Sequence, residues 1–136
     1  MTALPEPSRW QPMLDRHSTL FGNLDDGCRI GVVRREGAVP GPDMVVWEAR
    51  AGRLVAASQP FAGYANAGVD VLLSGDEEAM AELSEALDGD PLPVMKRHVR
   101  RGGIVCYVLK RQCELLDAGY EDVLQSLGVA FAGACR

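Results

Sequence analysis

The second half of the chain alternates between segments that favour strands and segments that favour helices. Val69 to Leu73 is a short apolar run broken only by Asp70, and a stretch with Met80, Leu83 and Leu87 at helical spacing follows it. Further on, Ile104 to Leu109 are six consecutive apolar residues, with a loop expected before them. Strands separated by helices are joined by right-handed crossovers, so this alternation predicts a parallel sheet covered by helices.

The apolar run from Ile104 to Leu109 has no charged residue to mark a solvent-facing side. Such runs are typical of central strands that are buried on both faces. We therefore expect this segment in the middle of the sheet and Cys106 in the core.

Helical spacing continues after this run. Leu115 and Leu116 begin a helical stretch that Gly119 interrupts, and a second stretch with Tyr120 and Val123 follows. That second stretch stops at Gly128, and residues 129 to 132 favour a last short strand.

A capping box marks the start of the helix after residue 73. Ser74 is followed three residues later by Glu77, a pattern in which the serine side chain accepts a hydrogen bond from the helix N-terminus. Asp76 to Glu78 crowd acids into the first turn, where the helix dipole stabilises them. The sequence predicts Ser74 as the cap.

The first half gives a weaker pattern. A capping box of Ser8 and Gln11 precedes apolar residues at helical spacing, which predicts a helix over 9–21. Cys28 to Arg35 indicates a strand, and Glu36 to Pro42, with two glycines and two prolines, a loop.

Residues 43–58 admit two interpretations. The β-forming run from Val45 to Trp47 favours a hairpin that turns at Ala51 and Gly52. The same stretch is rich in alanine and arginine and could be a helix interrupted by Gly52. The hairpin is favoured, and the helix stays open.

These elements predict one α/β domain over residues 1–136, with residues 1–7 as a loose lead-in. The expected sheet is mixed but largely parallel, with helices on both faces and an antiparallel N-terminal hairpin if residues 43–58 form one. A length of 136 residues supports a single core, because two cores would leave each near the lower limit for folding.

Composition excludes several classes of function. The net charge of −5 argues against a nucleic-acid binder, whose phosphate contacts need a basic surface. No run of about 18 apolar residues occurs, so no membrane span is expected. No secretory signal is visible at the N-terminus, which points to the cytoplasm and to four free thiols. The cysteines and the two histidines show no ligand spacing, so neither a metal nor a cofactor is expected.

Three stretches of the second half resemble the DsrE/DsrF/DsrH-like sulfur-relay family, which includes the Tus proteins of tRNA thiolation. They are AGVDVLLSGDEE, VRRGGIVCYVLKRQCELLDAGYEDVL and LGVAFAG, within residues 67–133. The resemblance implies a parallel sheet and a small soluble domain that works by protein contact and a cysteine persulfide. Family members usually place the reactive cysteine where the central strand ends, and this chain has Leu109 there.

Cys113 is the candidate catalytic residue. It follows Lys110 and Arg111 and lies near a predicted helix N-terminus, and both features stabilise a thiolate. The competing interpretation is a helix residue that packs against the sheet.

A basic cluster interrupts an otherwise acidic region. Lys96, Arg97, Arg100 and Arg101 fall within six residues, just before two glycines. They could bind a phosphate or an acidic partner surface. A solvated helix face that ends in a glycine turn would place the same residues equally well.

Two functions follow from the sequence. The first is a sulfur-relay-like domain that acts through protein contact. The alternative is a non-catalytic regulatory module that binds a partner or ligand with its sheet edge or its basic cluster. The expected partner is another protein or a second copy of the chain, with no membrane and no nucleic acid. Whether the chain is an enzyme stays open.

Overall fold

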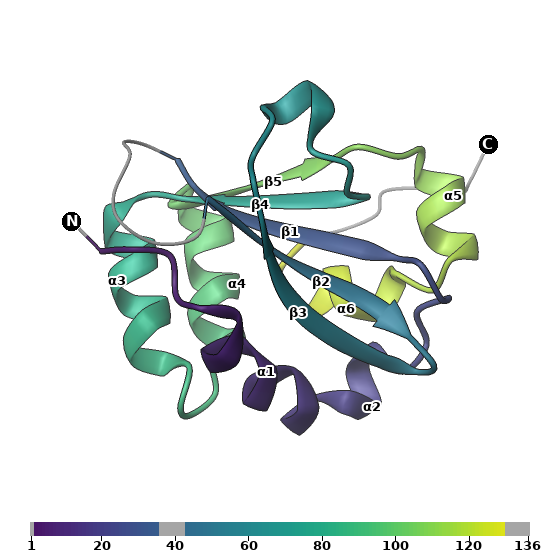
Figure 1. Ribbon diagram of the computed structural model, residues 1–136, viewed down its shortest axis with the longest axis horizontal. Coiled ribbons are helices and arrows are strands. Elements are labelled where there is room, and N and C mark those ends of the chain that lie inside the picture. The colour runs from purple at the N-terminus through teal and green to yellow at the C-terminus, as the bar shows by residue number, and fades with distance from the viewer. Residues whose placement is uncertain (1, 36–42, 130–136) are drawn as a thin grey trace.

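A five-stranded sheet organises the computed structural model, which describes residues 2–35 and 43–129 (Figure 1). The strands lie in the order β3-β2-β1-β4-β5, so β3 and β5 form the two edges. Their bounds are Arg29–Arg34 for β1, Met44–Arg50 for β2, Arg53–Gln59 for β3, Val71–Gly75 for β4 and Ile104–Val108 for β5.

The sheet is mixed, but it is not largely parallel as the sequence predicted. Only β1 and β4 pair in parallel, with Ile30 opposite Val71. The pairs β1–β2, β2–β3 and β4–β5 are antiparallel. The β4–β5 pairing therefore contradicts the parallel arrangement expected for the second half of the chain.

A helix that the sequence analysis missed explains the direction of β5. Two helices connect β4 to β5, α3 (Glu77–Ala86) and α4 (Leu92–Arg101), where one helix and a loop were expected. A single helix returns the chain for a parallel strand, whereas two antiparallel helices return it to the end at which β4 stopped. Helix α4 buries Met95 and His98 and ends at Gly102, whose φ of 85° is left-handed.

The helices α1, α3, α4 and α6 lie together on one face of the sheet (Figure 1). Between them and the strands lies the main core, which contains Trp10 and Trp47 with ring centroids 5.4 Å apart. On the opposite face a smaller apolar cluster, including Val46 and Leu72, packs beneath the segment that connects β3 to β4. This segment contains the 3-10 turn η1 (Tyr64–Asn66), which in the described chain takes the place of the expected second helical layer.

The N-terminal helix is divided into α1 (Pro7–Arg16) and α2 (Ser18–Phe21). The predicted capping box does not form, because Glu6 is the N-cap residue and makes no side-chain cap bond. The side chain of Gln11 instead donates to the carbonyl of Leu54 at 2.9 Å and accepts from the amide of Ala56 at 2.8 Å. Gln11 thereby joins α1 to the backbone of β3.

Residues 43–58 contain the favoured hairpin and not a helix. Strands β2 and β3 pair in register from Met44 opposite Gln59 to Arg50 opposite Arg53. Ala51 and Gly52 both have positive φ, 51° and 78°, which is the conformation of a type I′ hairpin turn.

Helix α3 is capped by a different residue from the one predicted. Ser74 lies fully buried inside β4, which extends to Gly75. Asp76 is the N-cap, and its Oδ1 accepts from the amide of Ala79 at 2.9 Å. The prediction of Ser74 is wrong because the strand continues two residues further than the apolar run suggests.

The prediction of a central position for Ile104 to Leu109 is also wrong. This segment forms β5 at the edge of the sheet, and within the described chain it pairs only with β4. Helices α5 (Gln112–Asp117) and α6 (Glu121–Ser126) follow, separated at Gly119 as predicted. Of the last predicted strand, residues 129–132, Val129 is described and is not part of a strand, and residues 130–132 lie outside the described residues. No helix in the described ranges is long and apolar enough to cross a membrane.

Candidate functional site

The large apolar side chains that remain exposed gather at one edge of the sheet. Four of them lie on β5 and the residue after it, and the fifth comes from η1 above the sheet. We call this surface the β5 patch: Tyr64, Val105, Tyr107, Val108 and Leu109. Each of these side chains is between 36% and 43% exposed.

Aromatic contacts join η1 to β5 across the top of the sheet. The ring of Tyr64 lies 4.7 Å from that of Tyr107 and 5.2 Å from that of Phe61, measured between centroids. The hydroxyl groups of Tyr64 and the buried Ser74 are hydrogen-bonded at 3.0 Å. Ser74 therefore holds an aromatic residue of the patch and does not cap a helix.

A hollow of about 350 Å³ adjoins the patch at the end of β5. One wall is the segment between η1 and β4, and the other is the chain just after β5. Its lining combines apolar side chains with polar groups, among them the Asp70 carboxylate and the Lys110 amine: Tyr64, Ala65, Ala67, Gly68, Val69, Asp70, Leu109 and Lys110.

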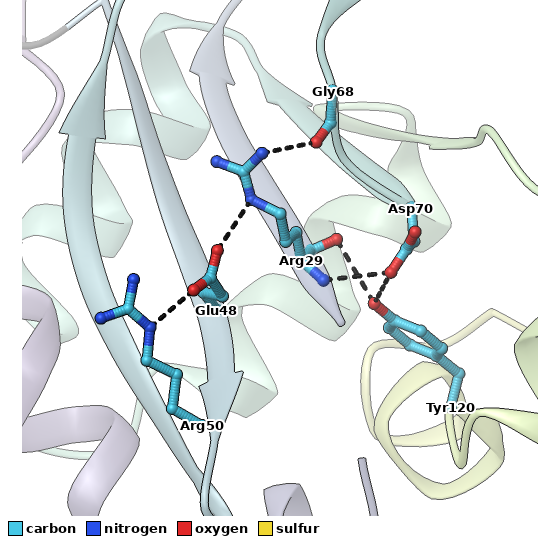
Figure 2. A network of polar contacts seen from close by, with 6 residues as sticks. All are labelled: Arg29, Glu48, Arg50, Gly68, Asp70 and Tyr120. Carbon is cyan, nitrogen blue, oxygen red and sulfur yellow. Dashed lines mark hydrogen bonds and ion pairs between the residues drawn. The ribbon is translucent and has the colours of Figure 1, made fainter. Parts of the chain in front are cut away.

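A network of polar contacts holds two residues that line the hollow, Gly68 and Asp70 (Figure 2). The Oδ2 atom of Asp70 accepts a hydrogen bond from the hydroxyl of Tyr120 at 2.7 Å and one from the amide of Arg29 at 3.0 Å. The Tyr120 hydroxyl also lies 3.3 Å from the carbonyl of Arg29. Tyr120 is fully buried, so this network ties the end of the site to the interior.

The guanidinium of Arg29 extends the network to the opposite side. Its Nη1 donates to the carbonyl of Gly68 at 2.8 Å, and its Nε lies 3.3 Å from Glu48. Arg50 donates to the same carboxylate at 2.6 Å and thereby lowers the pKa of Glu48. Gly68 lines the hollow and has a positive φ of 71°. The side chain of Arg29, from β1, thus holds its carbonyl.

Burial raises the pKa of Tyr120 well above its ordinary value, and the hydrogen bond to Asp70 raises it further. Tyr120 therefore stays protonated and donates to the carboxylate. Burial also raises the pKa of Cys28, beside it, and raises that of Cys106 to about 11. These are the two free thiols of the described chain, and neither is suited to nucleophilic chemistry near neutral pH.

The predicted catalytic residue, Cys113, lies in the first turn of α5 and is half-buried. Its sulfur belongs to a disulfide bond, so the expectation of four free thiols does not hold at this residue. It does not line the hollow.

The four residues of the predicted basic cluster all lie on α4, where their spacings of three and four residues make them neighbours on the helix surface. Arg97 forms an ion pair with Glu82 of α3. Lys96 lines a second hollow, of about 710 Å³, beside Arg16 and His17. Arg100 and Arg101 are exposed at the end of the helix that leads into β5. The phosphate- or partner-binding role of this cluster stays a prediction.

Metal chemistry finds no support in the described part of the chain. No group of three histidine, cysteine, aspartate or glutamate side chains lies close enough together there to hold a metal ion.

Sequence reasoning missed the patch and the hollow, because it placed Ile104 to Leu109 in the interior. One signal could have found the patch. Val105, Tyr107 and Leu109 alternate along an uncharged strand, and such a strand becomes an exposed apolar row if it lies at an edge.

No protein-family model matches this chain, and no curated protein sequence matches it either. The comparison with solved structures does find similar backbones. One is a ubiquinone synthesis protein, UbiJ-SCP2, with 10% identity, a TM-score of 0.47, and coverage of 90% of this chain and 84% of its own. Another is a conserved hypothetical protein from Thermus thermophilus, described as a possible sterol carrier protein. Its identity is 17%, its TM-score 0.48, and its coverage 96% of this chain and 89% of its own.

The resemblance to the sulfur-relay family does not hold. Neither similar structure carries the name of a sulfur-relay protein, since one is printed as a UbiJ-SCP2 ubiquinone synthesis protein and the other as a possible sterol carrier protein. The antiparallel pairing of β5 contradicts the parallel sheet that the family requires. The relay function, and with it the persulfide role of Cys113, is therefore withdrawn.

Proposed function

We propose that this chain is a non-catalytic binding domain that holds a partner or ligand against the β5 patch and the adjoining hollow. The observation that carries the proposal is the position of the exposed large apolar residues. In the described chain all five lie at this edge of the sheet, and four of them, Tyr64, Val105, Tyr107 and Leu109, share one face.

Apolar side chains that gather on one surface mark interaction sites more often than scattered ones do. Binding there would remove the rings of Tyr64 and Tyr107 from water, and the hydrophobic effect would stabilise the complex. Both rings already have partners, Tyr64 the hydroxyl of Ser74 and Tyr107 the tilted ring of Tyr64, so little side-chain freedom would be lost on binding.

The hollow adds two polar groups for orientation. Asp70 already accepts two hydrogen bonds from the protein, which supports a structural role for it. Lys110 is exposed at the rim and is the group that we expect to meet a polar or anionic part of a ligand. Apolar surface with a few fixed polar groups is the usual composition of a binding site.

A fluorescent apolar probe tests this function. We expect anilinonaphthalene sulfonate to bind the wild-type protein, and Tyr107→Ser to weaken binding roughly fivefold. Removing the exposed ring area should reduce the binding free energy by about 1 kcal/mol. The measurement is a fluorescence titration, with the unfolding midpoint of each variant confirming that it is folded.

Val55→Thr, on the opposite edge strand β3, is the matched control and should bind the probe as the wild type does. Equal binding by wild type and Tyr107→Ser would show that the probe binds elsewhere and would overturn the proposed function.

A further inference from the structure

The backbone of β5 presents an unused row of hydrogen-bonding groups. Towards β4, the amide of Leu109 donates to the carbonyl of Asp70 at 2.9 Å, and the carbonyl of Gly103 accepts from the amide of Asp76 at 2.8 Å. In an antiparallel pair such residues alternate with residues that face away. The groups of Ile104, Cys106 and Val108 therefore point to the free edge, where the described chain supplies no further strand.

Within residues 2–35 and 43–129, this edge lacks the usual protection. Edge strands are normally defended by lysine, proline, a bulge or a covering loop. Ile104–Val108 contains neither a charged residue nor proline, and its pairing with β4 is continuous. An extended peptide can add to such an edge as one more strand, with backbone bonds giving affinity and alternate side chains giving selectivity.

The side chains beside the edge define what such a peptide should carry. Tyr107 pairs with Leu72 of β4. Its side chain lies on the face of the sheet where the ring of Tyr64 contacts it. Val105 and Leu109 are on the same face, two residues to either side. A peptide strand placed next to β5 would meet this apolar row with every second side chain, so those side chains should be apolar.

Positive charges lie at both ends of the strand. Arg101 precedes it, and Lys110 and Arg111 follow it; all three are exposed. Arg111 has a surface contact with Glu114 at 3.6 Å, whereas Arg101 and Lys110 have no ion pair with any described residue. The edge is therefore apolar in the middle and basic at both ends.

From this pattern we propose that the partner is an extended peptide segment of another protein, with alternate apolar residues in its centre and acidic residues at its ends, which pairs with β5 as a sixth strand. The proposal rests on the proposed function and names the occupant of the same site. Charge selects this occupant over a second copy of the chain. In the self-pairing that uses Ile104, Cys106 and Val108, Arg101 of one copy would lie opposite Arg111 of the other, and these like charges repel.

The test uses fluorescein-labelled ten-residue peptides and anisotropy with the full chain. The first peptide has three alternate valines separated by threonines, with two glutamates at each end. The second has lysines in place of the glutamates. The third keeps the glutamates but is N-methylated at the amides that would face β5. We expect the first to bind, the second to bind at least tenfold more weakly, and the third not to bind.

A pair of protein variants tests the same pairing from the other side. Val108→Pro removes an amide that faces the free edge and not β4, a position at which edge strands tolerate proline. It should weaken binding of the first peptide at least tenfold, whereas Val108→Thr, which keeps the amide, should change it less than threefold. If Val108→Pro does not fold, the N-methylated peptide on the wild-type protein decides alone.

The outcomes separate this inference from the proposed function. Binding of the N-methylated or lysine-ended peptide as tightly as the first would overturn the strand pairing or the charge rule. Probe binding that depends on Tyr107, with no peptide binding, would overturn strand addition and leave the binding domain in place. A dimer in sedimentation that Val108→Pro abolishes would overturn the peptide in favour of a second copy.

Discussion

Tyr120 shows how a single buried residue can hold a site that it does not enter. Its ring belongs to the main core, and its hydroxyl donates a hydrogen bond to the carboxylate of Asp70, which lines the hollow (Figure 2). Asp70 in turn receives the amide of Arg29, at the start of β1. The position of the hollow's wall thus depends on a hydrogen bond made in the interior.

Removing that hydroxyl should destabilise the fold. We expect Tyr120→Phe to lower the free energy of unfolding by about 1 to 2 kcal/mol, because the partly buried carboxylate of Asp70 loses a donor. Tyr107→Phe is the control, since it removes a hydroxyl from an exposed ring, and should leave the stability within about 0.5 kcal/mol. Urea denaturation of the three proteins measures both values, and equal midpoints for wild type and Tyr120→Phe would contradict the role of the bond.

At the scale of elements, the beginning of α3 shows how far a sequence pattern can locate a boundary. The tetrapeptide Ser74 to Glu77 fits the capping-box template, but Asp76 is the residue at the helix start. The template compares residue types at fixed spacing and contains no information on where the preceding strand stops. The length of β4 determines the position of the cap. The strand continues to Gly75, which pairs with Ile104, so the helix can begin only after it.

The cap makes a prediction for α3. Asp76→Ala should cost about 1 kcal/mol of stability, because it removes the acceptor for the amide of Ala79. Glu78→Ala also removes a negative charge from the first turn, but it leaves this cap bond intact and should cost about 0.3 kcal/mol. Chemical denaturation of both variants compares them, and equal losses would mean that charge, and not the cap bond, stabilises this end.

Periodicity predicted the elements well where burial is one-sided. The helices around Met80, Leu83 and Val123 and the turn at Ala51 and Gly52 were confirmed, because each depends on local spacing or local backbone preference. Periodicity failed for β5. An uninterrupted apolar run is typical of a buried strand. An edge strand that pairs with a peptide can have the same run, so the pattern does not separate the two positions.

At the scale of the whole molecule, the number of helices between two strands determines the topology. A second helix between β4 and β5 implies an antiparallel β5, which the parallel sheet of the sulfur-relay family does not allow. The sequence contains a signal for this helix in Leu92, Met95 and Val99, which lie at helical spacing before Gly102. The basic residues between them obscure that signal, because they also fit a binding cluster.

The hollow beside the patch could not be predicted from the sequence for a related reason. Its walls come from residues 64–70 and from residues 109 and 110, which meet only because β4 and β5 are neighbours in the sheet. The depth of the hollow depends further on the hydrogen bond from Arg29 to Gly68. Neither strand order nor a contact over such a separation has a local sequence signature.

The buried thiols make the stability of the whole domain sensitive to alkaline pH. Burial raises the pKa of Cys106 from an unfolded value of 9.0 to about 11, so the folded state holds the proton more tightly than the unfolded chain does. The stabilisation by this group is complete below pH 9 and is lost as the pH rises from 9 to 11. It amounts to about 2 kcal/mol over that interval.

Cys28 and Tyr120 also have raised pKa values and contribute a loss in the same direction. The share of Cys106 is isolated by comparing wild type with Cys106→Val, which keeps a β-forming apolar residue in β5 but cannot ionise. In oxygen-free buffer, the urea midpoint should fall more steeply for the wild type than for the variant between pH 9 and 11, and the two should run parallel below pH 8. Parallel profiles across the whole range would show that the Cys106 thiol is not buried in the folded protein.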